Sequence, residues 1–166
     1  MRRQQALGVA VVVMLAGAGA GLVAYDAGLI ELPGEDQHDR ARVTFLDENG
    51  SVLTTVAVDV ADSRKERVRG LSDRDALENG SGMLFVHGGE DERTYVMRDM
   101  DFPIDIVFVG SDRRVTEVHP APMPPADRDQ LTPYRGRAKW VVELPHGFAA
   151  DHGIEPGVRI EIEYLD

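Results

Sequence analysis

"YVMRDMDFPIDIVFVG", residues 95–110, begins rich in methionine and charge and ends in a nearly continuous apolar run. The apolar part, 104–109, predicts a buried β-strand. One carboxylate, Asp105, lies inside it, and side-chain alternation along a strand places Asp105 on the same face as Val107 and Val109. Burying a carboxylate among apolar side chains is costly unless a partner pairs with it. Asp105 is therefore either a structural anchor or part of a site.

Short β-branched segments on both sides of this strand predict a β-rich domain. Asn49-Gly50 between two of them is a strong hairpin signal. The predicted strands are 42–46, 51–61, 83–87, 93–98, 104–110, 114–121, 139–145 and 157–165. We predict an α+β fold: a β-rich, compact or barrel-like domain of about seven or eight short strands with two or three short helices.

The helices are predicted from their capping residues. Ser63 and Glu66 have the spacing of a capping box, so a helix should start there and carry Val68 and Leu71 inward. Residues 72–75 repeat the pattern and predict a second helical turn. Residues 146–154 predict a third short helix that ends at a glycine.

The N-terminus predicts export. Residues 1–5 form a short positive region through Arg2 and Arg3, and residues 6–25 follow without a charge. Twenty residues at helical rise span about 30 Å, the thickness of a bilayer core. We expect a single-pass membrane anchor (1–25), a linker (26–41) and a folded domain (42–166) outside the cytoplasm. Secretion after signal-peptide cleavage is the alternative.

The composition excludes several functions. The 29 acidic and 18 basic residues leave a net charge of −11, which disfavours nucleic-acid binding. The acidic, lysine-poor surface is typical of a protein that works in high salt. The absence of cysteine excludes disulfides and thiolate chemistry. We predict no metal site and no cofactor, because the histidines are scattered and no phosphate-binding glycine loop follows a strand.

Several motifs, spread in order over residues 43–164, resemble the family of domain of unknown function 192 (DUF 192). The matching residues are Glu66, Arg67, Gly70, Leu71, Arg74, Gly82 to Phe85, Tyr95, Met97, Arg98, Pro103 and Asp105. The chain departs from the family pattern at Ser72, Val96, Asp99, Met100 and Val158. The resemblance implies a small β-rich domain and brings no established biochemical activity.

Asp105 and Glu143 are the two candidate carboxylates. The structural interpretation of Asp105 is an ion pair with Arg67, Arg74 or Arg98, and this is the interpretation that we favour. If Asp105 and Glu143 shared a cleft, they could act as the acid and base of a hydrolase.

The same region could instead bind a ligand without chemistry. The candidate ligand-binding residues are Arg67, Arg74, Met97, Arg98, Asp99, Asp105 and Glu143, in which the arginines would hold a carboxylate or phosphate. Ion pairs of these arginines with nearby aspartates are the simpler alternative. We favour a non-catalytic binding or accessory module for a small polar ligand, a glycan or an envelope protein over the hydrolase and over a purely structural or assembly domain.

Overall fold

The computed structural model describes residues 38–124 and 131–165. Within these two ranges, no helix is both long and apolar enough to cross a membrane. The predicted anchor, 6–25, and most of the predicted linker lie outside the described residues.

The described residues form a mostly-β domain of seven strands and two short helices, both within the predicted numbers. The elements are β1 (Arg40–Leu46), β2 (Val52–Ala61), α2 (Arg64–Arg69), β3 (Ser81–Tyr95), β4 (Ile104–Val109), β5 (Val115–Ala121), β6 (Tyr134–Pro145), α3 (Phe148–Asp151) and β7 (Arg159–Leu165).

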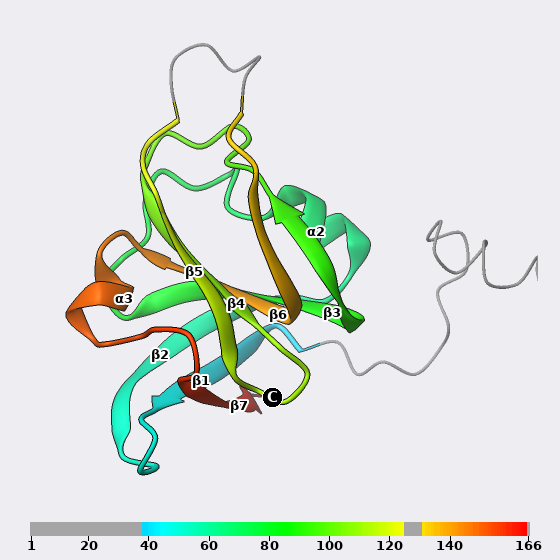
Figure 1. Ribbon diagram of the computed structural model, residues 1–166. Coiled ribbons are helices and arrows are strands. Elements are labelled where there is room, and N and C mark those ends of the chain that lie inside the picture. Colours follow the sequence, from blue (N-terminus) through cyan, green and yellow to red (C-terminus); the bar gives the residue numbers. More distant parts are fainter. Residues whose placement is uncertain (1–37, 125–130, 166) are drawn as a thin grey trace, which may run out of the picture. The chain divides into compact units, whose positions relative to one another are not determined.

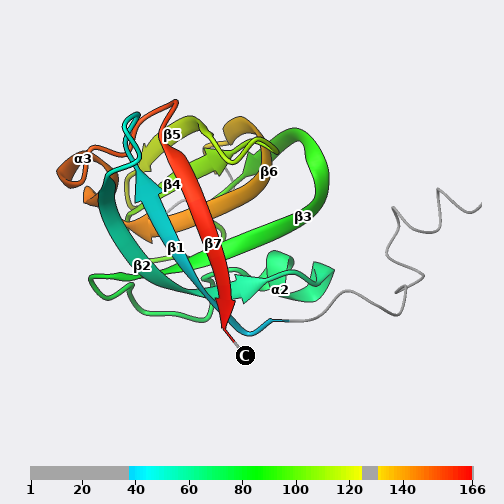
Figure 2. The same ribbon diagram turned by 90° about the horizontal axis from the view of Figure 1, so that it is seen from below.

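One mixed sheet holds all seven strands, in the order β5-β4-β6-β3-β2-β1-β7. Only β2 and β3 pair in parallel, and α2 lies on the connection between them. The sheet is open, but it curls so strongly that its edges meet at one corner (Figures 1 and 2). There Arg114 forms a bridge with Arg159, and the Ile160 amide donates to the Arg113 carbonyl at 2.8 Å.

Both faces of the sheet carry a hydrophobic core. On one face Phe45, Val107, Val142 and Ile160 belong to a cluster that α3 joins through Phe148. The second cluster, on the other face of β3, β4 and β6, is built from side chains of those strands and from the segments after α2 and before β4. Its members include Leu71, Phe85, Met97, Met100, Phe102, Ile106 and Phe108. The central strands are therefore buried on both sides, which explains their continuous apolar sequence.

Helix α2 begins as the sequence predicts. The Ser63 side chain accepts from the Glu66 amide, and the Glu66 carboxylate accepts from the Ser63 amide at 3.1 Å. Val68 is 70% exposed, so the prediction that it faces the core is wrong; Leu71, just after the helix, is buried as expected. Residues 72–75 form no second helix.

The prediction of two separate strands within residues 83–98 is wrong. This segment forms one long strand, β3, up to Tyr95, and its pairing with β6 shifts between Val86 and Asp91. The acidic stretch 88–92 is thus an irregularity within a strand and does not form a turn. On either side of this irregularity in β3 lie His87 and Tyr95, whose side chains contact each other.

Gly136 in β6 permits close packing against Phe108. A Cβ atom at this position would lie 2.5 Å from the Phe108 Cγ atom, in a side chain with no exposed surface. We expect Gly136→Ala to lower the free energy of unfolding by about 1–3 kcal/mol through overpacking, measured by urea denaturation. The matched control is Gly89→Ala, where a Cβ would meet nothing within 4 Å. Equal stability of the two variants would contradict this packing.

Candidate functional site

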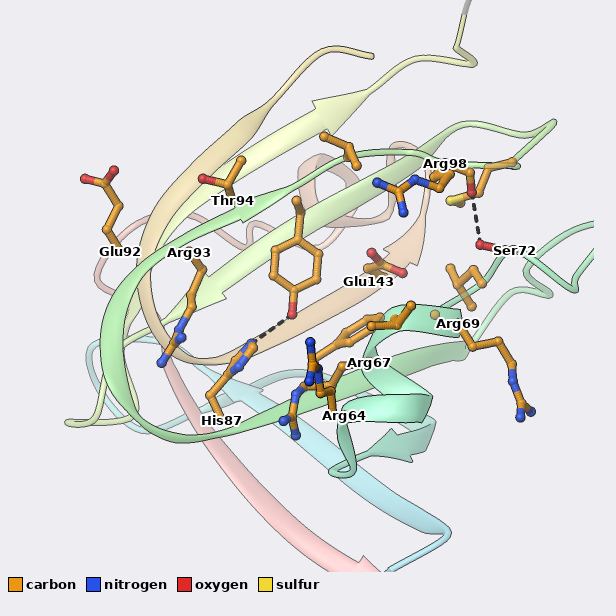
Figure 3. Close-up of a pocket in the computed structure, with 17 residues that line it drawn as sticks. Arg64, Arg67, Arg69, Ser72, His87, Glu92, Arg93, Thr94, Arg98 and Glu143 are labelled. Carbon is orange, nitrogen blue, oxygen red and sulfur yellow. Dashed lines mark hydrogen bonds between the residues drawn. The ribbon is translucent and has the colours of Figure 1, made fainter. Parts of the chain in front are cut away.

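A pocket of about 440 Å³ lies between α2, β3 and the end of β6 (Figure 3). We call it the Glu143 pocket. Its apolar lining comes from Val68, Leu71, Phe85, Val96 and Met100, and its polar lining from Arg64, Arg67, Arg69, Ser72, His87, Glu92, Arg93, Thr94, Tyr95, Arg98 and Glu143. The volume is in the range of small-molecule sites.

Glu143 is the buried carboxyl of this pocket. It pairs in register with Met83 of β3 and Ile106 of β4, so its side chain lies among the residues of the second core. Only 6% of the residue is exposed, and its Oε2 atom has no hydrogen-bond partner. Burial raises the pKa of Glu143 from 4.5 to about 8. At neutral pH the carboxyl is therefore mainly protonated and can donate a hydrogen bond.

Tyr95 and His87 form a hydrogen-bonded pair beside Glu143. The Tyr95 hydroxyl and the His87 Nε2 atom are 3.0 Å apart, and the Tyr95 ring packs edge-on against Phe85 and Phe108. Burial raises the pKa of Tyr95, and the nearby Glu143 adds to this effect. Burial, and then the charges of two arginines, lower the pKa of His87 to about 4. Both groups are neutral at pH 7.

Five arginines surround the pocket, in a chain whose net charge is −11. Two of them are tied to the backbone: Arg67 Nη1 donates to the Val86 carbonyl at 2.9 Å, and Arg93 Nη2 donates to the Gly89 carbonyl at 2.7 Å. Arg69 lies 3.7 Å from Asp73. The Arg98 guanidinium makes no hydrogen bond or ion pair with any described residue.

Arg98 and Glu143 face the same space. In Figure 3 the Glu143 carboxyl lies between Arg98, which reaches in from above, and α2, which carries Arg67. No arginine of the described ranges is within ion-pair distance of Glu143, so the cations attract anions to the pocket without neutralising this carboxyl. A small polar molecule in this space could therefore contact the charged Arg98 guanidinium on one side and the neutral Glu143 carboxyl on the other.

Asp105 serves a different purpose. It is 2% exposed, as expected, but the predicted arginine partner is wrong. The carboxylate accepts from the Ala149 amide at 2.8 Å and from the Gly147 amide at 3.1 Å, and His146 Nδ1 lies 3.3 Å away. These contacts attach the turn that leads into α3 to the adjacent strand β4. Asp105 is absent from the lining of the Glu143 pocket.

The register of β4 and β6 separates the two carboxylates. Asp105 pairs with Leu144, while Glu143 pairs with Ile106. Neighbouring residues of a strand point to opposite faces, so Asp105 and Glu143 lie on opposite faces of the sheet. The single cleft that the two-carboxylate hydrolase requires is not formed by this pair.

The other predicted residues divide as follows. Arg67 and Arg98 line the pocket with Glu143. Arg74 forms an ion pair with Asp59, away from that lining. Met97 is 3% exposed and belongs to the core. Asp99 adopts a left-handed backbone conformation, with φ of 56°, in the connection before β4.

Sequence reasoning missed His87, Arg93 and Tyr95 as site residues. Tyr95 is one of the residues that carry the family resemblance, and this is the one signal that could have pointed to it. In residues 38–124 and 131–165 no group of three or more metal-ligating side chains is brought together.

The fold and the pocket define a class: a mostly-β domain with one mixed, curled sheet and a ligand-sized pocket beside its second core. The chain belongs to the DUF192 family, described as "Uncharacterized ACR, COG1430", whose model matches residues 44–162.

Solved structures that are similar to this chain include the following two. A proposed transcription regulator from Sinorhizobium meliloti 1021 is 26% identical, with a TM-score of 0.66, over 77% of this chain and 97% of that one. A protein of unknown function from Novosphingobium aromaticivorans DSM 12444 is 34% identical, with a TM-score of 0.60, over 72% of this chain and 83% of that one. No curated protein matches the chain.

Proposed function

We propose that this domain is a non-catalytic binding module that takes a small polar ligand into the Glu143 pocket. The observation that carries the proposal is the unpartnered Oε2 atom of Glu143, in a carboxyl that is 6% exposed and lines a pocket of about 440 Å³. Buried polar groups are nearly always hydrogen-bonded, and an exception calls for an explanation. A ligand that bonds to Glu143 supplies one.

The lining supports binding of a small molecule more than binding of a protein surface. Leu71 and Phe85, both buried, line the pocket together with the buried carboxyl of Glu143 and a rim of arginines. A concave pocket of about 440 Å³ that combines apolar walls with directed polar groups suits a small molecule. A glycan or an envelope protein would need a wider polar surface, so these occupants rank below a small ligand.

A thermal-shift screen of the full-length chain in mild detergent tests the proposal. A ligand that binds only the folded state at one hundred times its Kd should stabilise it by about 2.7 kcal/mol and raise Tm. Glu143→Leu should abolish the shift, and Lys65→Gln, a change on α2 outside the pocket, should retain it. If no sugar, amino acid or organic anion raises the Tm of the wild type, the purely structural alternative gains and binding is contradicted.

One observation favours a second candidate, an enzyme that uses Glu143 alone. A carboxyl with a pKa of about 8, beside Tyr95 and His87, has the properties of a general acid. We rank this candidate lower because burial by itself accounts for the raised pKa of Glu143. Turnover of a bound ligand that disappears in Glu143→Gln would establish it over simple binding.

For the location, we propose that residues 6–25 hold the chain in the cell membrane with the domain outside the cytoplasm. The length of the uncharged run and the arginines before it support this orientation. The N-terminal mass of the protein isolated from membranes distinguishes an intact anchor from a cleaved signal peptide, which would yield a secreted domain.

A further inference from the structure

We propose that the ligand of the Glu143 pocket is a small organic carboxylate with an apolar body, held by Arg98 and by the carboxyl of Glu143. This inference rests on the proposed binding function and specifies its ligand. It follows from the charge of the pocket, from the Arg98 and Glu143 side chains that face it, and from its apolar surface.

The charge of the pocket selects an anion. Its rim carries the arginines at 64, 67, 69, 93 and 98 against one exposed acid, Glu92. Glu143 adds no negative charge at neutral pH, and His87 and Tyr95 are neutral as well. A cationic or zwitterionic ligand would bring a positive charge close to five arginines, with Glu92 as the one exposed acid of the lining, which electrostatics disfavours. An oxyanion, in contrast, is attracted by the positive charges of these arginines.

Two polar groups are available to such an anion. The Arg98 backbone carbonyl accepts from the Ser72 hydroxyl, but the Arg98 guanidinium makes no hydrogen bond or ion pair with any described residue. Guanidinium groups bind carboxylates through two parallel hydrogen bonds. Glu143 in its protonated form donates an O–H, and an O–H to O⁻ bond is among the stronger hydrogen bonds. One carboxylate between them would satisfy both, because Figure 3 shows Arg98 and Glu143 turned toward the same space.

The apolar surface of the pocket favours an organic anion over inorganic phosphate. Val68 and Val96, at the rim, are 70% and 37% exposed, two of the few large apolar side chains left open among the described residues. Phe85 and Met100 also line the pocket. An apolar ligand body would cover these side chains and gain hydrophobic stabilisation, whereas phosphate would leave them in water.

The titration of Glu143 gives the proposal a specific pH dependence. The groups that line the pocket with it are Arg64, Arg67 and Arg69 from α2, His87, Glu92, Arg93 and Tyr95 from β3, and Arg98. The pKa of His87 is lowered to about 4 and that of Tyr95 is raised, so neither group changes charge between about pH 7 and about pH 9.5. Ionisation of Glu143 would replace a donor by a negative charge facing the carboxylate, so affinity should fall about tenfold per pH unit above about pH 8.

The test is isothermal titration of the full-length chain in mild detergent with three probes that share a phenyl ring: benzoate, benzamide and benzylamine. We expect benzoate to bind and the neutral and cationic probes to bind at least about tenfold more weakly. Benzoate affinity should fall about thirtyfold between about pH 7 and about pH 9.5. Glu143→Gln, which keeps a donor, should bind benzoate with no such pH dependence, and Arg98→Gln should weaken binding about tenfold while Lys65→Gln leaves it unchanged.

The outcomes separate this inference from the binding function. Equal binding of benzamide, or binding of inorganic phosphate in preference to benzoate, would overturn the carboxylate while the pocket would remain a binding site. Binding of benzoate that is unaffected by Arg98→Gln or by pH would also overturn it. If no probe and no member of the wider screen binds, both the ligand class and the proposed function fail.

Discussion

Asp105→Ala should lower the free energy of unfolding by about 3–5 kcal/mol, the largest effect that we expect of any single substitution outside the pocket. The change removes the acceptor of two backbone amides, at Gly147 and Ala149, and the neighbour of His146. Each buried amide that is left without a partner costs about 1–3 kcal/mol. Urea denaturation monitored by tryptophan fluorescence measures the loss.

The matched control for this prediction is Asp151→Ala, which removes an exposed carboxylate from α3 and should cost under about 0.5 kcal/mol. Asp105→Asn, which keeps one acceptor oxygen, should fall between the two. Any of these variants that folds should retain the ligand affinity of the wild type, because Asp105 is absent from the pocket lining. A folded Asp105→Asn protein that loses ligand binding would contradict the structural role.

Glu143→Gln should make the protein progressively more stable than the wild type as the pH rises from about 4.5 to about 8. In this window the folded state keeps a proton on Glu143 that the unfolded chain has released, because burial raises its pKa from 4.5 to about 8. The folded state therefore binds more protons, and wild-type stability falls by about 1.4 kcal/mol per pH unit. Above about pH 8 the difference should stay constant.

The wild type alone does not test this prediction, because His87 changes the pH dependence of stability in the opposite direction. The wild type must therefore be compared with Glu143→Gln. The pKa of His87 is lowered from 6.5 to about 4, so between these values the unfolded chain binds more protons and stability rises with pH. The two slopes largely cancel between about pH 4.5 and about 6.5 in the wild type. Subtracting the pH dependence of the free energy of unfolding of Glu143→Gln from that of the wild type isolates the contribution of Glu143. Parallel curves for the two proteins would show that Glu143 is ionised in the folded state.

The local patterns predicted most of the strands and the start of α2. The Asn49-Gly50 signal correctly marked the hairpin between β1 and β2, where Gly50 has φ of 80°. The spacing of Ser63 and Glu66 correctly marked a cap, because both contacts are made within four residues. Such features need no knowledge of the distant chain, so sequence reasoning can find them.

Features that depend on the register between distant strands could not be predicted from the sequence. The burial of Asp105 was predictable from its apolar neighbours, but its amide donors come from a turn 42 residues away. Whether Asp105 and Glu143 share a face depends on whether Asp105 pairs with residue 143 or 144, and a shift of one residue exchanges the two faces. The sequence contains no marker of that choice.

The composition of the pocket was also only partly predictable. Arg67, Arg98 and Glu143 were candidates, and the structure brings these three together. His87 and Tyr95 meet because β3 changes its register against β6 between Val86 and Asp91. An acidic, glycine-containing stretch at this position resembles a turn, and nothing local distinguishes a turn from an irregular strand.

The central claim is that Glu143 is a neutral acid at physiological pH in an anion-attracting pocket. Carbon-13 NMR of the glutamate side-chain carboxyls, with Glu143→Gln to assign the signal, tests it most directly. We predict a signal that titrates with a pKa of about 8 in the free protein and at a higher pKa when benzoate is bound, because the anion favours the protonated form. A Glu143 signal that titrates near its ordinary value of 4.5, or that moves to lower pKa with benzoate, would contradict the account.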